Sequence, residues 1–447
     1  MRSPLPVVFP FALALLAGCL GGAPLYPPRP PATAGAPIAD PPPSRVVVHA
    51  TLTGKAMSEA LEQAAPKTGT GTFPMLGKDR TFTWERDPLS LAFSQGRVGI
   101  GGHVRVRAEM PVGHLEFSLD LKVLGEPVLT SEYVARLQSL DVAVSSRDTK
   151  VRLADALGGV LEKIRGEMAE KLGDFSYDLR PLVTEAYGRL TQPIDLPLGD
   201  AHGCAALTVL GAEAGPTVLA DGIEKDLALI VSPSVTLPCS VQSPPPPLPP
   251  LANVANVPSG PFTIQVPVAA RYEELAKAMS LTFTDGKYFF SKEFPGLYME
   301  NPEIYAGRDE LVLKVHLKGP VHKFGGDHDL DGDLFLTGHP TVIDNEVRIP
   351  DLEPTIETKS FLLKLKATFE GDQIRDSARQ ALRLDLGERL ASVKQRLSKD
   401  LSFANGMGCV KADVLKAEIT GVFAHASYLR VQTSITARAA VYAPCPQ

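Results

Sequence analysis

The chain has 447 residues, of which 44% are hydrophobic and 21% are charged, and its formal net charge at pH 7 is −6. This composition is typical of a globular protein with room for two or three domains. The mild acidity, without a basic patch or a basic motif interleaved with aromatic residues, argues against nucleic acid as a partner. Beyond the N-terminal apolar run, no segment is long and apolar enough to be a transmembrane helix.

The N-terminus has the layout of a secretory signal peptide. Arg2 precedes the apolar run VVFPFALALLAG, which is too short to span a bilayer, and small residues precede Cys19. The four residues LAGC resemble the lipobox of bacterial lipoproteins, and this resemblance implies cleavage before Cys19 and acylation of that cysteine. Leu20 stands where inner-membrane retention would favour Asp, so the resemblance further implies a cell-envelope protein anchored in the outer membrane and facing the periplasm. A signal peptide with an incidental cysteine is the alternative.

Two proline-rich segments organise the rest of the chain. Residues 19–44 contain almost no large apolar side chains, so we expect a lipid anchor followed by an extended tether of about 3.1 Å per residue. Residues 243–261, which include SPPPPLPP, form a second such segment and are predicted to be a linker. With the signal peptide at 1–18, this leaves two predicted domains, a first half at 45–242 and a second half at 262–447.

The two halves share motifs in the same order. HGCAALTVL and TLPCS close the first half, MGCVKADVL and YAPCP close the second, and DLKVLGEP from Asp120 corresponds to DLFLTGHP from Asp333. The offset between matched positions stays nearly constant, which predicts an internal duplication. In an oxidising compartment, this symmetry favours two disulfides, Cys204 with Cys239 and Cys409 with Cys445, among the three connectivities. A metal site is the weaker alternative, because CxxC spacing is missing.

Each half is predicted to run from a strand through a short helix, long strands and long helices to final strands. Period-two alternation of apolar residues predicts strands at residues 46–52, 98–123, 262–268, 311–336 and 429–441. Spacing of three to four residues predicts helices at residues 153–172, 179–190 and 386–397. A long helix is the only element available to cover each sheet's dry face. We therefore expect an α+β fold with tandem duplication, each half a long curved antiparallel sheet wrapped around a long amphipathic helix.

Three segments carry a resemblance to a known family: SRVVVHATLTGKAMSEALEQAAP, FTWERDPLSLAFSQGRVGIGG and the stretch that begins GDLFLTGHPTVIDNEVRIPDLEP. From about Ser44 to the C-terminus the chain resembles bacterial domain-of-unknown-function family 4403, a family of envelope proteins. The order of elements, the duplication and the cysteine pair in each half also resemble the tubular lipid-binding superfamily, which includes bactericidal permeability-increasing protein. The second resemblance implies an apolar tunnel or groove, but a fold analogy alone does not assign a function.

Catalytic and metal-binding motifs are scarce. The sequence has no G-x-S-x-G, no Walker loop and no H-E-x-x-H, so we expect neither an enzyme nor a cofactor. Asp327, Asp329 and Asp331 resemble the start of a calcium loop, but Gly338 stands where that loop needs a bidentate Glu, so an acidic hairpin turn is the preferred interpretation. The strands would have to align four histidines for these to form another metal site: His316, His322, His328 and His339. We expect Trp84 to be a packing anchor beside a surface pair, Arg86 and Asp87.

Two functional hypotheses remain. In the first, the protein is a lipid-anchored module that binds or passes lipids or other apolar ligands in the cell envelope. The long helix of the first half would then line the groove, with ligand-binding side chains Leu157, Leu161, Ile164 and Met168. In the alternative, the same fold has filled interiors and serves as a structural or interaction protein in envelope assembly. The sequence leaves both open, because side chains that face a lipid tunnel or a packed core are equally apolar.

Replacing the predicted acylation site tests the anchor. We expect Cys19→Ser to release the protein from the membrane fraction while its thermal unfolding stays unchanged, because the substitution lies outside the predicted domains. Metabolic labelling with a fatty acid, followed by fractionation, measures this. Labelling that persists in the Cys19→Ser protein would contradict the assignment.

Overall fold

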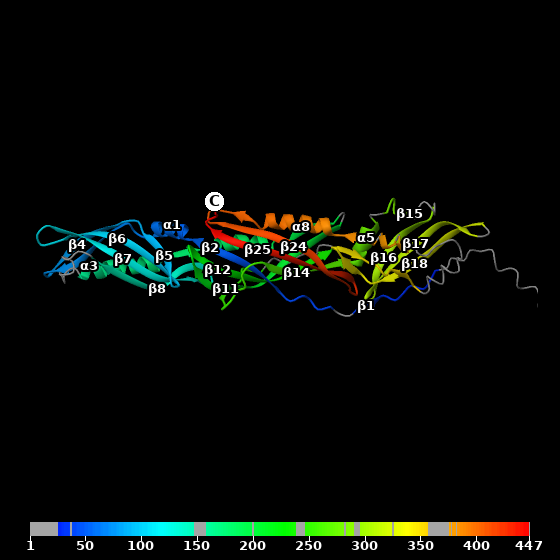
Figure 1. Ribbon diagram of the computed structural model, residues 1–447, viewed down its shortest axis with the longest axis horizontal. Coiled ribbons are helices and arrows are strands. Elements are labelled where there is room, and N and C mark those ends of the chain that lie inside the picture. Colours follow the sequence, from blue (N-terminus) through cyan, green and yellow to red (C-terminus); the bar gives the residue numbers. More distant parts are fainter. Residues whose placement is uncertain are drawn as a thin grey trace, which may run out of the picture.

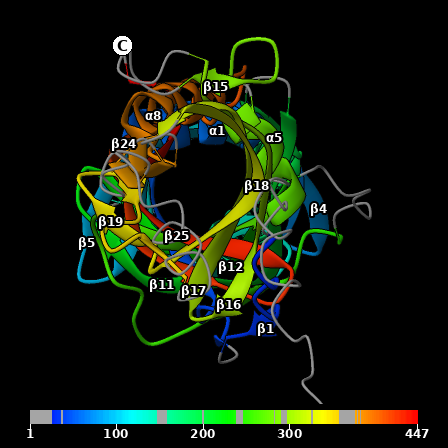
Figure 2. The same cartoon turned by 90° about the vertical axis from the view of Figure 1, so that its right-hand side faces the viewer.

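The computed structural model describes residues 26–35, 38–146, 158–198, 201–237, 246–280, 283–289, 296–323, 326–355, 375–376, 378–380 and 382–446. The signal peptide, Cys19, Leu157 and Cys239 lie outside this range. The molecule is elongated: a central sheet lies in the middle, with one sheet toward each end (Figure 1). The predicted α+β class is confirmed, and the sheets curl around the long axis (Figure 2).

The central sheet is built from strands of both halves. Its order is β10-β11-β12-β14-β25-β24-β23, with β2 paired to β12 and β25, and β13 paired to β11. The first half contributes β2 (Ser44–Thr53), β10 (Ile194–Leu198), β11 (Ala201–Leu219) and β12 (Gly222–Leu237). The second half contributes β14 (Phe262–Arg271), β23 (Phe403–Ala404), β24 (Cys409–Ala424) and β25 (Tyr428–Ala443), and β13 (Leu251–Asn253) comes from the predicted linker.

The strands β2 and β14 lie end to end between β12 and β25, so together they fill one strand position of this sheet. β2 is antiparallel to β12 and parallel to β25, whereas β14 is antiparallel to β25 and parallel to β12. The two strands meet at their N-terminal ends, where the Gln265 amide donates to Ser44 Oγ at 3.1 Å. Each half therefore completes the hydrogen-bond ladder of the other, and the central sheet is continuous across the predicted domain boundary.

The first end sheet has the order β3-β4-β6-β7-β8-β9, with β5 paired to β6. Its strands are β3 (Thr68–Met75), β4 (Lys78–Arg86), β5 (Ser90–Ser94), β6 (Arg97–Glu109), β7 (His114–Leu129), β8 (Val134–Ser145) and β9 (Ser176–Asp178). Helix α3 (Gly158–Gly173) packs against β8 and β3, which lie toward opposite edges of the sheet. Helix α1 (Gly54–Ala64) follows β2, and Thr53 caps it by accepting from the Ala56 amide.

The second end sheet has the order β1-β16-β17-β18-β21, with β15 paired to β16. Its strands are β1 (Thr33–Ala34), β15 (Tyr288–Phe289), β16 (Tyr298–Arg308), β17 (Glu310–Lys323), β18 (Gly326–Gly338) and β21 (Glu353–Pro354). A small third sheet contains β19 (Thr341–Ile343), β20 (Glu346–Arg348) and β22 (Leu384–Asp385). The remaining helices are α4 (Arg180–Thr191), α5 (Tyr272–Ser280) and α8 (Gly387–Asp400), so α4 and α8 match the predicted helices closely.

Both proline-rich segments pack against the folded body where the structure describes them. In the linker, the phenol of Tyr133 donates to the carbonyl of Pro249 at 2.7 Å, and the phenol of Tyr187 donates to that of Pro246 at 2.6 Å. Prolines offer carbonyl acceptors but no backbone donor, so tyrosine hydroxyls are suitable partners. Burial raises the pKa of Tyr133 to about 12, which keeps this donor protonated.

The N-terminal segment, defined here as residues 26–35 and 38–40, follows the second end sheet instead of standing off as a free tether. β1 pairs in parallel with β16, and the Tyr305 hydroxyl donates to the Pro30 carbonyl at 3.2 Å. Arg29 forms an ion pair with Glu303 and lies over the Tyr305 ring. The segment is extended, as the sequence predicts, but its polar and ring contacts hold it against the body.

Arg430 fastens the far end of this segment. Its side chain is only 3% exposed, its guanidinium donates to the Ile38 carbonyl at 3.1 Å, and it lies 3.0 Å from a carboxylate oxygen of Asp40. A buried guanidinium needs such partners, since an unpaired buried charge is strongly unfavourable. The contact therefore couples the segment to β25 of the central sheet.

Removing this guanidinium should loosen the N-terminal segment. We expect Arg430→Met to speed amide hydrogen exchange at Thr33 and Ala34 of β1, with a loss of about 1–2 kcal/mol in local stability. Arg438→Met on the same strand is the control, because Arg438 is exposed. Unchanged exchange in Arg430→Met would show that β1 is held without the Arg430 contact.

Candidate functional site

An apolar cavity of about 860 Å³ lies over the central sheet. Its floor comes from β2, β11, β12, β14, β24 and β25, and its cover comes from α4 and α8, so both halves contribute to one continuous space. Figure 2 shows α8 on the opposite side of the long axis from β12 and β25. A volume of this size is in the range of natural ligand pockets, about 300–1,000 Å³.

Three strands of the floor, β2, β14 and β25, present the dry faces that the sequence predicts. Apart from Thr51, the lining residues of β2 and β14 alternate along each strand: Val46, Val48, Ala50 and Leu52, then Phe262, Ile264, Val266, Val268 and Ala270. In β25 they are Leu429, Val431, Thr433, Ile435, Ala437, Ala439, Val441 and Ala443, together with Arg438. Ile264 and Ile435 form a cross-strand pair, and both are only partly buried by the protein. Apolar surface of this kind contributes about 25 cal/mol per Å² when a ligand covers it.

The cover presents the apolar faces of the two helices. From α4 these are Leu182, Val183, Ala186 and Leu190, and from α8 they are Leu390, Val393 and Leu397, with Leu386 just before the helix. Both helices follow the three-to-four-residue periodicity of the sequence. Three of their charged residues, Arg189, Arg396 and Asp400, also line the cavity. The space between sheet and helices is therefore mostly apolar on both sides.

Polar contacts join the two halves beside α4 and α8. The side-chain amide of Asn405 donates to Glu185 at 2.9 Å, and Arg189 pairs with the same carboxylate at 3.0 Å. These hydrogen bonds, chiefly the one from Asn405, lower the pKa of Glu185. The Arg189 guanidinium also lies 4.4 Å from the centre of the Phe403 ring. α4 of the first half is thus tied to the segment that follows α8 of the second half.

The predicted ligand-binding side chains lie elsewhere. Ile164 and Met168, on α3, are 0% and 1% exposed in the packed core of the first end sheet, and Leu161 packs against that core. None of the three lines the cavity, and Leu157 lies outside the described residues. The helices that do line it, α4 and α8, show the same periodicity as α3, so periodicity could not identify which helix covers a packed core and which covers a cavity.

The acidic segment forms a strand instead of a loop. Asp327, Asp329 and Asp331 all belong to β18, where alternate residues lie about 6.7 Å apart. Asp331 accepts a hydrogen bond from Tyr26 at 3.0 Å and lies 3.2 Å from His316. Within the described residues, no group of three or more His, Cys, Asp or Glu side chains could hold a metal ion.

The histidines pair separately with carboxylates. His316 lies 3.0 Å from Asp333 across β17 and β18, and His103 lies 3.1 Å from Asp120 across β6 and β7. His339 has a different carboxylate partner, Asp351, at the edge of the second end sheet. His316 and His339 therefore belong to separate pairs.

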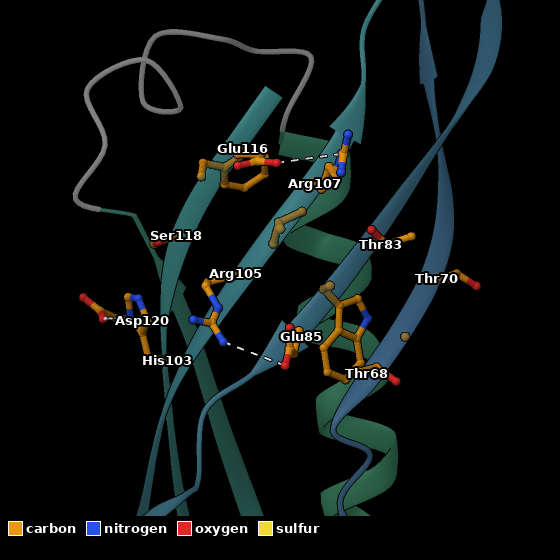
Figure 3. Close-up of a pocket in the computed structure, with 14 residues that line it drawn as sticks. Thr68, Thr70, Thr83, Glu85, His103, Arg105, Arg107, Glu116, Ser118 and Asp120 are labelled. Atoms are coloured by element: carbon orange, nitrogen blue, oxygen red, sulfur yellow. Dashed lines mark hydrogen bonds and ion pairs between the residues drawn. The ribbon is translucent and has the colours of Figure 1, made fainter. Parts of the chain in front are cut away.

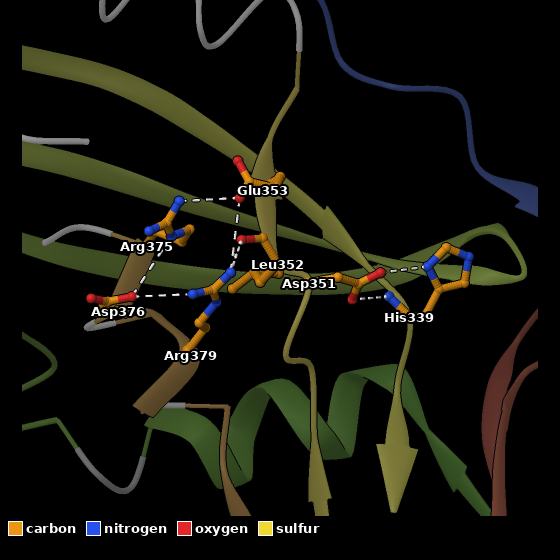
Figure 4. A network of polar contacts seen from close by, with 7 residues as sticks. All are labelled: His339, Asp351, Leu352, Glu353, Arg375, Asp376 and Arg379. Atoms are coloured by element: carbon orange, nitrogen blue, oxygen red, sulfur yellow. Dashed lines mark hydrogen bonds and ion pairs between the residues drawn. The ribbon is translucent and has the colours of Figure 1, made fainter. Parts of the chain in front are cut away.

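Figure 4 shows the polar network around His339. The Nδ1 atom of His339 lies 2.6 Å from Asp351, whose hydrogen bond raises the pKa of the imidazole. Nearby, Arg375 pairs with Glu353 at 3.1 Å, and Arg379 donates to the Leu352 carbonyl at 3.3 Å. These contacts fasten the segment that precedes α8 to the sheet, which is a structural role.

A second hollow, of about 900 Å³, lies on the first end sheet (Figure 3). Its charged side chains engage one another: Arg105 lies 3.8 Å from Glu85, and Arg107 lies 3.8 Å from Glu116. These exposed ion pairs contribute little to stability.

Trp84 is a packing anchor, as predicted, whereas the predicted surface pair beside it is not formed. Trp84 is 2% exposed and belongs to the core of the first end sheet. Arg86 is also buried and pairs with Glu62 of α1 at 2.9 Å, because its guanidinium reaches the carbonyls at the end of that helix. The Asp87 carboxylate instead faces Arg105 at 3.3 Å.

The cysteines near the C-terminal ends of the halves differ from the predicted pattern. Cys409 and Cys445 are free thiols, and they lie within hydrogen-bonding contact of each other. Burial and the neighbouring Cys445 raise the pKa of the Cys409 thiol to about 11, which keeps it protonated. The bridge between them is therefore not formed in the structure, although the two sulfurs are adjacent. Cys204 is disulfide-bonded, and its pairing with Cys239 stays a prediction, because Cys239 lies outside the described residues.

Fold and cavity together define an elongated α+β protein with one apolar chamber shared by two halves. The chain belongs to the family described as "Domain of unknown function (DUF4403)", which matches residues 42–442. Among the described residues, no helix is both long and apolar enough to cross a membrane.

Comparison with individual proteins adds little to this family assignment. No match was found among curated proteins. One similar solved structure is titled "Crystal structure of lipopolysaccharide binding protein"; it is 13% identical, has a TM-score of 0.30, and the match covers 90% of this chain and 99% of that one. A likeness with so low a TM-score carries no weight for the function.

Two isoleucine substitutions separate core from cavity. We expect Ile164→Ala to lower the free energy of unfolding by about 2–5 kcal/mol, because it empties a packed core, and to leave binding of apolar probes unchanged. Ile435→Ala shortens a partly buried side chain that lines the cavity. It should therefore lower the free energy of unfolding by only about 1 kcal/mol and change the affinity for the probe. Denaturant melts with probe titrations measure both effects. Loss of probe binding in stable Ile164→Ala protein would place the site at α3.

Proposed function

We propose that the protein binds the acyl chains of lipids, or apolar ligands of similar shape, in the cavity over the central sheet. The observation that carries this proposal is the cavity of about 860 Å³, whose sheet floor and helix cover are both apolar. A packed interior of the same composition would leave few voids larger than a water molecule. The partly buried lining side chains are therefore suited to contact with a ligand. The proposal assigns no catalytic step to the chain.

We also infer an internal duplication, which would account for the shared chamber. β2, β11 and β12 of the first half correspond in their pairings to β14, β24 and β25 of the second. The cross-strand pairs His103 with Asp120 and His316 with Asp333 correspond as well, both with an offset of 213 residues (316 − 103 and 333 − 120). In this interpretation, two copies of one sheet-and-helix unit join at the central sheet, and α3 is the helix around which the first end sheet wraps.

We further propose that acylated Cys19 anchors the chain to the outer membrane from the periplasmic side. The docked N-terminal segment supports a body held close to the anchor, because Tyr26 bonds to β18 and lies seven residues after Cys19. Seven residues reach at most about 25 Å. Under this proposal, the second end sheet lies nearest the membrane, and the cavity begins beyond it.

Filling the cavity tests the binding function. Ala439 lines the cavity, and the next residue, Ala440, points to the opposite face of β25. We expect Ala439→Trp to reduce binding of a fluorescent acyl probe at least about tenfold, because the indole occupies the space of the chain. Ala440→Trp is the matched control and should bind the probe like the wild type.

The competing hypothesis predicts a different result. A structural protein with no ligand would show no saturable probe binding in the wild type. Equal binding by wild type and folded Ala439→Trp protein would place the site outside this cavity.

A further inference from the structure

Lys225 is a cation on an otherwise apolar part of the cavity floor. It lies on β12, where Ile223 and Leu227 line the cavity on either side of it. Across the sheet it is opposite Ala50 of β2 and Thr217 of β11. All four neighbours line the same cavity, so the lysine stem is surrounded by cavity lining.

The ammonium group of Lys225 has no carboxylate partner among the described residues. Its Nζ atom donates a hydrogen bond to Thr217 Oγ1 at 3.2 Å. The adjacent carboxylates point to the other face of β12, where His49 contacts Asp226 at 2.9 Å and Glu224 at 3.8 Å. Burial without a compensating charge lowers the pKa of Lys225.

Lys225 differs in this respect from the other charged residues of the lining. Arg136, Arg189, Arg396 and Arg438 are exposed, so water can solvate their guanidinium groups, and Arg189 also pairs with Glu185. Of the carboxylates, Glu274 is engaged by Lys277 at 2.8 Å, and Asp400 is exposed at the end of α8. Lys225 is therefore the lining cation that is partly withdrawn from water and still able to accept an anionic partner.

We propose that Lys225 binds the anionic head group of an amphiphilic ligand, a carboxylate or a phosphate, while the ligand's chain lies along β2 and β14. This inference rests on the proposed binding function and narrows its ligand class to anionic amphiphiles. The geometry suits such a ligand, because the apolar residues of β2 and β14 form one continuous row that starts beside Lys225. Thr217 orients the ammonium group and adds a hydroxyl that can donate to the same head group.

Two probes that differ only in their head group test the assignment: parinaric acid, a fluorescent fatty acid, and its methyl ester. We expect the full-length wild-type protein to prefer the acid. Lys225→Met should weaken binding of the acid about tenfold and leave the ester unchanged, because only the charged contact is removed. Lys225→Arg should keep the preference. Lys122→Met, at an exposed position of β7, is the control and should behave as wild type.

The outcomes separate the two proposals. If wild-type protein binds both probes and Lys225→Met retains the preference for the acid, the head-group assignment is wrong although the cavity still binds chains. If wild-type protein binds neither probe, the binding function itself fails, and the assignment fails with it. Should Lys225→Met not fold, Lys225→Gln provides the same comparison with a neutral side chain that can still reach Thr217.

A phosphate competition identifies the source of the anion. We expect inorganic phosphate at millimolar concentration not to displace parinaric acid, because the apolar chain supplies most of the affinity, whereas a lysophosphatidic acid should displace it. Displacement by inorganic phosphate alone would show that Lys225 serves a free anion instead of a lipid head group, and would overturn the proposal.

Discussion

β2 and β14 both lie between β12 and β25 of the central sheet. The rest of the structure depends on this shared position. Each strand completes the backbone hydrogen bonding of β12 and β25 at once, so neither half can leave the other without exposing unpaired strand edges. The arrangement also aligns the apolar faces of both halves into one surface. Two helices cover that surface, and the space that they leave is the cavity.

Local periodicity predicted the apolar faces of three strands of the cavity floor, β2, β14 and β25. Alternation along a strand depends only on the backbone, so the apolar set Val46, Val48, Ala50 and Leu52 was identifiable without knowledge of the partners. The same reasoning predicted the apolar faces of α4 and α8. It could not show that Ile164 of α3 faces a packed core, because that depends on which sheet each helix meets.

Contacts between residues far apart in the chain could not be predicted from the sequence. Arg86 pairs with Glu62 of α1, and Arg430 reaches Ile38 across 392 positions, and neither partner is apparent from the sequence around the arginine. Lys225 did leave a local signal. In GIEKDLALIV it takes a position in the row Ile223, Leu227 and Leu229 that alternation assigns to the apolar face, and a charge at such a position indicates either a buried partner or a ligand.

The central claim is that the shared chamber holds a lipid, and the native occupant tests it most directly. The full-length protein would be purified under native conditions and extracted with organic solvent, which removes bound lipid but leaves covalently attached acyl groups on the chain, and the extract would be analysed by mass spectrometry. The account predicts an anionic amphiphile in near-stoichiometric amount, and a smaller amount from protein whose cavity is filled by Ala439→Trp. Extracts without lipid, or with equal amounts from both proteins, would contradict it.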